Sequence, residues 1–227
     1  PDLVGISVMF TISRPSVADV GVFLKSRYPA LPIIAGGVCV SNDVEFLLRA
    51  VPQIDIGSFY EADRSLPDLL DVVNGTKPVS EIRQVAILNG QDCISTRERA
   101  TPTEKEMDVQ PEYYDLPIGD YAKYGSMGAF NFMRGERKAT AVISNRGCRA
   151  RCSFCAVRNF NDLSVRGRAV SSVVDEIEHL KASYGISHFM WLDDDLLYNG
   201  KRAIDLFNEI TRRNLKITWD ASNGLIA

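Results

Sequence analysis

The sequence has no apolar run that approaches the ~20 residues needed to cross a membrane, and no signal peptide opens it. Histidine occurs only twice in 227 residues, and no low-complexity tract or repeat of fixed period is present. Basic residues number 26 and acidic residues 29, and the net charge of −3 excludes a generally basic nucleic-acid-binding protein. A chain of this size buries roughly 70% of its unfolded surface, so it needs no disulfide framework. We therefore expect a globular, cytoplasmic protein without a membrane span.

Short apolar runs alternate with amphipathic stretches over residues 1–75. This alternation predicts a parallel sheet with helices on both faces. Ser16 and Asn42 are candidate N-caps of the first two helices, and Asn74-Gly75 is expected to end the third. The strands are predicted at 3–10, 31–36 and 54–57, and the third helix at 66–73.

The next segment, 84–96, contains two short strands around Asn89-Gly90. This dipeptide is typical of a tight hairpin turn, in which both central residues need positive φ. Apolar periodicity then fades, and residues 97–138 are predicted to form a connector. Four tyrosines are expected to lay this connector across a neighbouring surface: Tyr113, Tyr114, Tyr121 and Tyr124.

From residue 139 the alternation of strands and helices resumes. Ser172 and Asp175 fit a capping box for a helix over 172–184, and Gly185 fits the end of that helix. Strands are predicted at 140–144, 187–192 and 215–219, and a second helix at about 201–213. The predicted fold class is therefore α/β, with 1–96 as a first domain, 97–138 as a linker and 139–227 as a second domain.

Three of the five cysteines lie in the motif Cys148-Arg-Ala-Arg-Cys152-Ser-Phe-Cys155. Thiolates at this C-x-x-x-C-x-x-C spacing can converge on one inorganic centre if the backbone wraps around it. Iron–sulfur clusters are normally held by four cysteine thiolates, so three local ones leave one iron with an open coordination site.

Other interpretations of this motif stay open. An electron-transferring cluster would take a remote fourth ligand, and a structural zinc site would need four closed ligands. The further zinc ligands would have to come from Cys39, Cys93, His179 or His188. A disulfide is not expected in a chain without a secretory signal.

At these cysteines the sequence resembles the radical S-adenosylmethionine enzymes. Their hallmark is this three-cysteine spacing with an aromatic residue before the last cysteine, here Phe154. The lead-in at 144–148 also resembles the family's strand-to-loop entry, and the resemblance covers about 139–227. It implies the N-terminal half of a (β/α) barrel, because the family barrel has six βα units and three strands are predicted here.

The resemblance implies a 4Fe-4S cluster on Cys148, Cys152 and Cys155, whose open iron chelates S-adenosylmethionine. One-electron reduction would cleave S-adenosylmethionine to methionine and a 5′-deoxyadenosyl radical, which abstracts hydrogen from the substrate. The protein would hold the cofactor and exclude water, while the cofactor carries the difficult chemistry.

Further contacts with S-adenosylmethionine are implied by the same resemblance. Phe154 would help to shape the adenine pocket, chiefly through its backbone. Asp193 and Asp194 follow a predicted strand, where such barrels place ligand-binding side chains. The alternative for these aspartates is a solvated turn or a charge effect at a helix N-terminus.

Residues 1–75 resemble the later part of a cobalamin-binding, flavodoxin-like (Rossmann-like) domain. In that family a Gly-Gly turn at a strand end, here Gly36-Gly37, lets the backbone approach the nucleotide tail of the cofactor. A tight βα turn would use the same glycines without any cofactor. The chain departs from the family at 57–61, and no Asp-x-His-x-x-Gly motif is visible.

Basic residues are dense around the cysteine motif. Between Arg134 and Arg168 there are nine of them against two acidic residues, Glu136 and Asp162. Such a cluster compensates an anionic iron–sulfur centre and the cofactor carboxylate, or it recognises an anionic substrate such as a phosphorylated lipid or tRNA.

Together the resemblances imply a cobalamin-dependent radical S-adenosylmethionine enzyme that transfers a methyl group to, or otherwise modifies, a small-molecule or lipid substrate. One alternative is a radical enzyme that modifies tRNA without cobalamin, and another is a non-catalytic iron–sulfur or cobalamin electron-transfer module. The expected partner is an electron donor such as a flavodoxin or ferredoxin. Strand-like apolar runs lie at both ends of the chain, so we expect it to be a fragment of a longer protein.

Overall fold

Residues 1–124, 137–162 and 164–226 are described by the computed structural model of the chain. The chain packs into two compact units: unit 1 is Pro1–Pro102 with Ser153–Asp162, and unit 2 is Thr103–Cys152 with Leu163–Ala227. The domain boundaries expected from the sequence stay predictions. None of the described helices is both long and apolar enough to cross a membrane.

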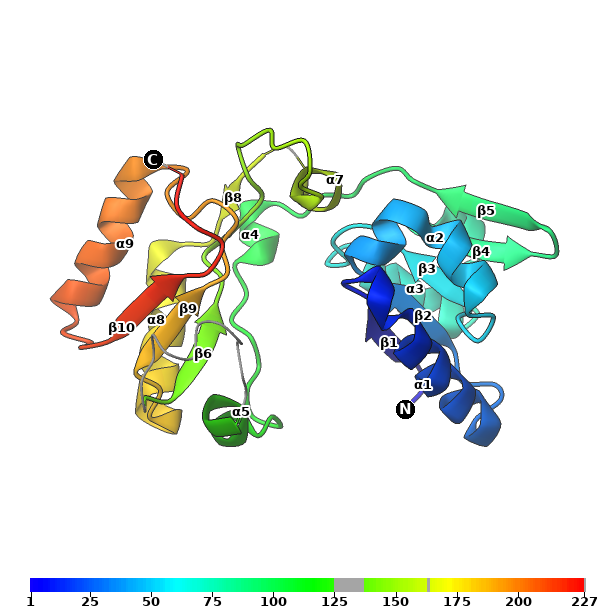
Figure 1. The fold of residues 1–227 in the computed structure, drawn as a ribbon, viewed down its shortest axis with the longest axis horizontal. Coiled ribbons are helices and arrows are strands. Elements are labelled where there is room, and N and C mark those ends of the chain that lie inside the picture. The colour runs from blue at the N-terminus through cyan, green and yellow to red at the C-terminus, as the bar shows by residue number, and fades with distance from the viewer. Residues whose placement is uncertain (125–136, 163, 227) are drawn as a thin grey trace. The chain divides into compact units, whose positions relative to one another are not determined.

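The sheet of unit 1 has the strand order β1-β2-β3-β4-β5 (Figure 1). The first three strands are parallel and the last two form an antiparallel hairpin. Their bounds are β1 Val4–Ser7, β2 Ile33–Gly36, β3 Ile56–Ser58, β4 Val85–Asn89 and β5 Asp92–Thr96.

Helices cover both faces of this sheet, as predicted. On one face α1 (Arg14–Arg27) and α2 (Val38–Ala50) bury a core that includes Val44. On the other face α3 (Ser65–Val73) contributes Leu69, which is 1% exposed. Both cores consist mostly of branched aliphatic side chains, whose burial drives the layers together.

Two helix starts in unit 1 differ from the prediction. The N-cap of α1 is Ser13 rather than Ser16. α2 begins after Gly37, because the positive φ of this glycine (101°) turns the chain directly from β2 into the helix. The expected cap Asn42 lies inside α2, next to Asp43, whose non-helical angles (φ −149°, ψ 69°) interrupt the helix.

The hairpin turn lies one residue later than predicted. Asn89 pairs with Asp92, so the turn residues are Gly90 and Gln91, and of these only Gly90 has positive φ (61°). Arg49 of α2 donates a hydrogen bond to the carbonyl of Gln91 at 2.7 Å, which fixes the turn against the helix.

Unit 2 contains a three-stranded parallel sheet of order β10-β9-β6, covered on one face by α8 and α9 (Figure 1). Trp191 of β9 is fully buried in the core beneath these helices. The bounds are β6 Ala139–Val142, α8 Val170–Tyr184, β9 His188–Trp191, α9 Gly200–Arg212 and β10 Thr218–Ala221. The predicted α/β class with parallel sheets is confirmed.

Local features of unit 2 correct three expectations. α8 begins after Ala169 without a side-chain cap, so the capping box expected at Ser172 is absent. β10 starts three residues later than predicted, because Asn214 and Lys216 have positive φ (52° and 47°) and interrupt extended structure. Gly185 ends α8 with a φ of 69°, as predicted.

The connector is more structured than its sequence indicates. It contains α4 (Glu104–Met107) and α5 (Ile118–Tyr124). Of the tyrosines expected to anchor it, Tyr113 packs against the unit 2 core, whereas Tyr114 and Tyr121 are 86% and 60% exposed. The side chain of Tyr124 lies outside what the structure describes.

Candidate functional site

Three cysteines that form no disulfide lie on the irregular loop between β7 (Asn145–Arg146) and α7 (Val157–Asn161). Cys152 is exposed, whereas Cys148 and Cys155 are half-buried. The boundary between the two units falls directly after Cys152. In the described ranges no group of three Cys, His, Asp or Glu side chains lies in an arrangement that could hold a metal ion. The convergence of the three sulfurs therefore stays a prediction.

The start of the cysteine loop is fixed by Gly147. β7 pairs antiparallel with β8 (Arg166–Gly167), which brings the chain before β8 close to this residue. Gly147 has a φ of 99°, and a Cβ there would collide with the carbonyl oxygen of Ser164. Only glycine fits here, so the backbone enters Cys148 along a defined path.

The next residue of the loop, Arg149, is tied to Asp195, which follows β9. The Asp195 side chain is fully buried, and its Oδ2 lies 3.0 Å from Nε of Arg149. The same oxygen accepts the backbone N–H of Arg149 at 3.4 Å. The interpretation of the sequence did not identify this ion pair. The local feature that could have drawn attention to it is the third aspartate in a row after Asp193 and Asp194.

Asp193 holds the backbone just after β6 through hydrogen bonds from Ser144. It is 2% exposed, and its carboxylate accepts the hydroxyl of Ser144 at 2.6 Å and the backbone N–H of Ser144 at 3.1 Å. Burial raises the pKa of Asp193, and the hydrogen bonds from Ser144 together with the charge of Arg202 counteract that rise. Asp194 is half-buried. Ligand contact by either aspartate stays a prediction.

Gly36 and Gly37 lie at the carboxyl end of β2. A Cβ on Gly37 would lie 2.9 Å from the carbonyl oxygen of Val8, so the turn itself requires this glycine. A Cβ on Gly36 would meet only Ser58, at 3.7 and 3.9 Å, which is ordinary contact. The fold therefore explains Gly37 and leaves Gly36 unexplained.

No protein-family model matches the chain. The cytidylyl-2-hydroxyethylphosphonate methyltransferase of Streptomyces wedmorensis is 33% identical over 243 residues, covering 99% of this chain and 45% of that protein. An uncharacterized methyltransferase of Pyrococcus horikoshii is 27% identical over 226 residues, covering 98% of this chain and 46% of that protein. The chain thus spans about half the length of these curated relatives.

Two solved structures match the fold. TsrM of Kitasatospora setae, a radical S-adenosylmethionine methyltransferase with tryptophan and an S-adenosylmethionine analogue bound, has a TM-score of 0.75 and 19% identity over 94% of this chain and 41% of that chain. OxsB, a cobalamin-dependent S-adenosylmethionine radical enzyme with aqua-cobalamin and S-adenosylmethionine bound, has a TM-score of 0.76 and 21% identity over 97% of this chain and 30% of that chain. The chain has the fold of the cobalamin-dependent radical S-adenosylmethionine enzymes. The fold implied by the resemblance is therefore supported.

The donor chemistry of the cysteine loop fits the cluster of the radical S-adenosylmethionine family. All three thiols are free of disulfides and are carried by irregular backbone rather than by a helix or strand. Cysteine thiolates are the ligands of iron–sulfur clusters. Of the residues considered as alternative zinc ligands, His188 is engaged within unit 2, where it hydrogen-bonds to Asp220 at 2.9 Å and to Thr218 at 2.8 Å.

The carboxyl edge of the unit 1 sheet fits a cobalamin tail in two respects. A Cβ at Gly36 would make only ordinary contacts, with Ser58 at 3.7 and 3.9 Å, so no described protein atom occupies that position. Beside it, the hydroxyl of Ser58 is buried and has no hydrogen-bond partner within the described residues. Buried polar groups usually have partners, so this hydroxyl marks a place for a polar group of a ligand. Ser58 falls in the segment where the sequence departs from the family.

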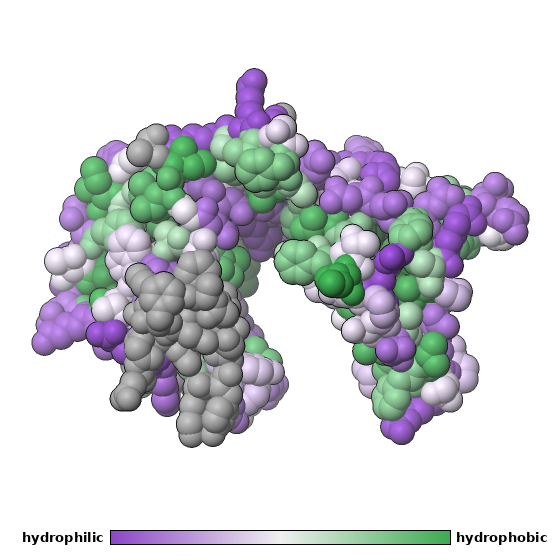
Figure 2. Space-filling view, in the orientation of Figure 1, coloured by the Kyte–Doolittle hydropathy of each residue, from purple (hydrophilic) through white to green (hydrophobic). Residues whose placement is uncertain are grey.

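The loop after β1 borders the same edge. It exposes Met9, Phe10 and Ile12 to solvent, at 51%, 66% and 87%. Hydrophobic surface is visible on this part of unit 1 in Figure 2. Phe154 of the cysteine loop is also highly exposed, at 90%, and its expected role at the adenine stays a prediction.

The basic cluster around the cysteines is partly neutralised within unit 2. Arg149 pairs with Asp195 at 3.0 Å and Arg168 with Glu176 at 2.6 Å. Both carboxylates come from outside the 134–168 segment, so the sequence count overstates the local charge. Arg134 and Glu136 of that count lie outside the described residues.

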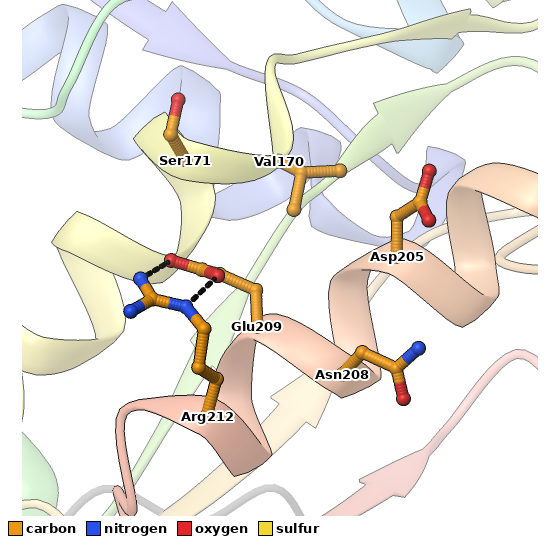
Figure 3. A pocket seen from close by; sticks show the side chains of 6 residues that line it. All are labelled: Val170, Ser171, Asp205, Asn208, Glu209 and Arg212. Atoms are coloured by element: carbon orange, nitrogen blue, oxygen red, sulfur yellow. Dashed lines mark hydrogen bonds and ion pairs between the residues drawn. The ribbon is translucent and has the colours of Figure 1, made fainter.

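A pocket of about 520 Å³ lies between α8 and α9 (Figure 3). Its charged groups are paired: Glu209 pairs with Arg212 at 2.6 Å, and Asp205 pairs with Lys201, outside the lining, at 2.7 Å. All of its lining residues come from these two helices and none from the cysteine loop. We assign it no part in the candidate site.

Proposed function

We propose that this chain is the portion of a cobalamin-dependent radical S-adenosylmethionine methyltransferase that holds the cluster and the cobalamin tail. The observation that carries the proposal is the loop of three cysteines outside any disulfide, after the first strand of a parallel sheet, in a chain with this fold. The 33% identity to a methyltransferase over 99% of the chain favours methyl transfer.

In this proposal, separate groups of residues hold the cluster and the cobalamin. Cys148, Cys152 and Cys155 would hold a 4Fe-4S cluster, and Gly36 with Ser58 would receive the nucleotide tail of cobalamin. When bound, these groups supply the electron that cleaves S-adenosylmethionine and a carrier for the methyl group. Gly147 fixes the entry of the cysteine loop.

The proposal also assigns the strands and segments of the chain to the barrel and to the cobalamin-binding-like domain. β6, β9 and β10 would be the first three strands of the (β/α) barrel, in spatial order along the sheet. Residues 1–96 would form the cobalamin-binding-like domain, 97–138 a linker and 139–227 the half-barrel. Asp193, Asp194 and Phe154 would border S-adenosylmethionine, the two aspartates partly through the backbone that they hold.

We propose a small-molecule substrate. Tryptophan is the substrate of TsrM, and the relative that is 33% identical is a cytidylyl-2-hydroxyethylphosphonate methyltransferase. A lipid is the alternative substrate, and the proposed electron donor is a protein such as a flavodoxin or ferredoxin. No particular residue of the chain supports either of these two assignments. tRNA modification and pure electron transfer are the competing functions.

The proposal is tested on the full-length protein, purified and reconstituted without oxygen. With S-adenosylmethionine and a reductant, the wild type should release 5′-deoxyadenosine, and the Cys148→Ala/Cys152→Ala/Cys155→Ala variant should not. The Cys39→Ala variant is the matched control and should behave as wild type. A cluster that is reduced normally but never cleaves S-adenosylmethionine would support electron transfer instead.

A further inference from the structure

The carboxylate of Asp195 is the most deeply buried acid near the cysteine loop, with 0% of its side chain exposed. A buried charge is costly unless it is paired and hydrogen-bonded. The described partners of its Oδ2 are the guanidinium and the backbone N–H of Arg149. Its Oδ1 is buried and has no hydrogen-bond partner within the described part of the chain.

Both Asp195 and Arg149 are held by further contacts. The carbonyl of Asp195 accepts a hydrogen bond from the buried amide of Asn145 at 3.2 Å, in β7. Nη2 of Arg149 donates to the carbonyl of Ile226 at 2.7 Å. The loop after β9 therefore contacts the chain on both sides of Cys148, at Asn145 and at Arg149.

We infer that Asp195 is a positioning residue for the cluster: it fixes the backbone next to Cys148 and sets the net charge beside that thiolate. The inference rests on the proposed function, because it assumes that Cys148 is a cluster ligand. Groups that orient the ligands of a metal typically change its retention by about 10-fold to 100-fold when they are removed. Nearby charge also sets the reduction potential of an iron–sulfur cluster.

Replacing Asp195 and replacing Arg149 should shift the reduction potential of the cluster in opposite directions. Reduction adds negative charge to the cluster, so an additional positive charge nearby favours the reduced form. Asp195→Asn leaves the Arg149 guanidinium uncompensated and should shift the reduction potential to a more positive value. Arg149→Gln leaves the Asp195 carboxylate uncompensated and should shift it to a more negative value. The double variant should return toward the wild-type potential.

The experiment uses the full-length, reconstituted protein. Iron release to a chelator, the reduction potential of the cluster and the thermal unfolding midpoint are measured for Asp195→Asn, Arg149→Gln and the double variant. Asp205→Asn is the matched control, because it breaks an exposed ion pair with Lys201 on the outer helix α9. We expect Asp195→Asn to release iron about 10-fold faster or more, with the control unchanged.

The outcomes distinguish a failure of the proposed function from a failure of this inference. A wild type that takes up no iron would overturn the proposed function and this inference with it. A wild type that binds a cluster, combined with unchanged iron release and potential in Asp195→Asn, would overturn the inference alone. Shifts of the same sign in both single variants would also overturn it, since they would indicate a general loosening of the fold. Arg149 is half-exposed, so its variant gives a potential even if Asp195→Asn does not fold.

Discussion

Gly36 and Gly37 are neighbours in the turn after β2, but their substitution should have different consequences. Gly37→Ala adds a Cβ at 2.9 Å from the Val8 carbonyl oxygen, in a backbone with a φ of 101°. It should lower the free energy of unfolding by roughly 1–3 kcal/mol, the usual cost of holding a residue with a Cβ in this essentially glycine-only backbone region. Gly36→Ala meets only ordinary contacts and should change stability by less than about 0.5 kcal/mol.

Cobalamin retention separates the roles of these glycines. We expect Gly36→Ala to lose cobalamin while its unfolding in urea matches the wild type, because the added methyl group fills the space for the nucleotide tail. Cobalamin is measured by its absorption after gel filtration of the full-length protein. Full retention by Gly36→Ala would remove this edge from the cobalamin site.

The five cysteines should divide into two groups when they are replaced one at a time. Cys148→Ala, Cys152→Ala and Cys155→Ala should each lose the visible iron–sulfur absorption. Cys93→Ala should keep it, because burial raises the pKa of this thiol, and the thiolate is the form that binds metal. Loss of iron in Cys93→Ala with retention in Cys155→Ala would contradict the assignment.

At the scale of elements, Tyr113 is one of the residues that hold the connector to α8. The hydroxyl of Tyr113 donates to Oε1 of Glu176 at 2.6 Å, and Arg168 pairs with the other oxygen of the same carboxylate. Burial raises the pKa of Tyr113 above its ordinary value of 10.0, and the hydrogen bond to Glu176 raises it further. The hydroxyl therefore stays protonated in the folded state where it would ionise in the unfolded chain.

Tyr113→Phe should lower the free energy of unfolding by about 1–2 kcal/mol at pH 7, because one oxygen of Glu176 loses its donor. The folded-state pKa is raised, so the contribution is complete below pH 10 and declines as the pH rises through that value. Urea denaturation at pH 7 and above pH 10 measures both effects. Tyr114→Phe, at an 86% exposed position, is the control, and equal losses in both variants would contradict the anchoring role.

Elements with a buried, periodic face were predictable, and local ends were not. β9 and α8 lie within about two residues of their predicted positions, because four buried residues in a row and a continuous apolar stripe dictate them. The cap of α8 and the start of β10 depend instead on backbone angles set by neighbouring segments. The pair of Arg149 and Asp195 joins residues 46 apart, and no local pattern indicates such a contact.

For the whole molecule, the distribution of charge bears on the class of substrate. The chain carries a net charge of −3, and two arginines of its densest basic segment are paired with carboxylates in unit 2. Arginines held in this way donate to the protein and not to phosphates. The basic segment therefore gives little support to an RNA substrate, although its sequence alone left that possibility open.

We expect the full-length protein to bind tRNA too weakly to form a complex at physiological salt. Affinity for a polyanion grows with the number of phosphates that free Lys and Arg neutralise, and each contact adds to the salt dependence. Filter binding with labelled tRNA at about 50 and about 200 mM salt measures both quantities. Glu176→Gln is an informative companion, because it weakens the neutralisation of Arg168 without adding a basic residue. A stable wild-type complex whose affinity falls steeply with salt would contradict this expectation. It would favour tRNA modification over methyl transfer to a small molecule.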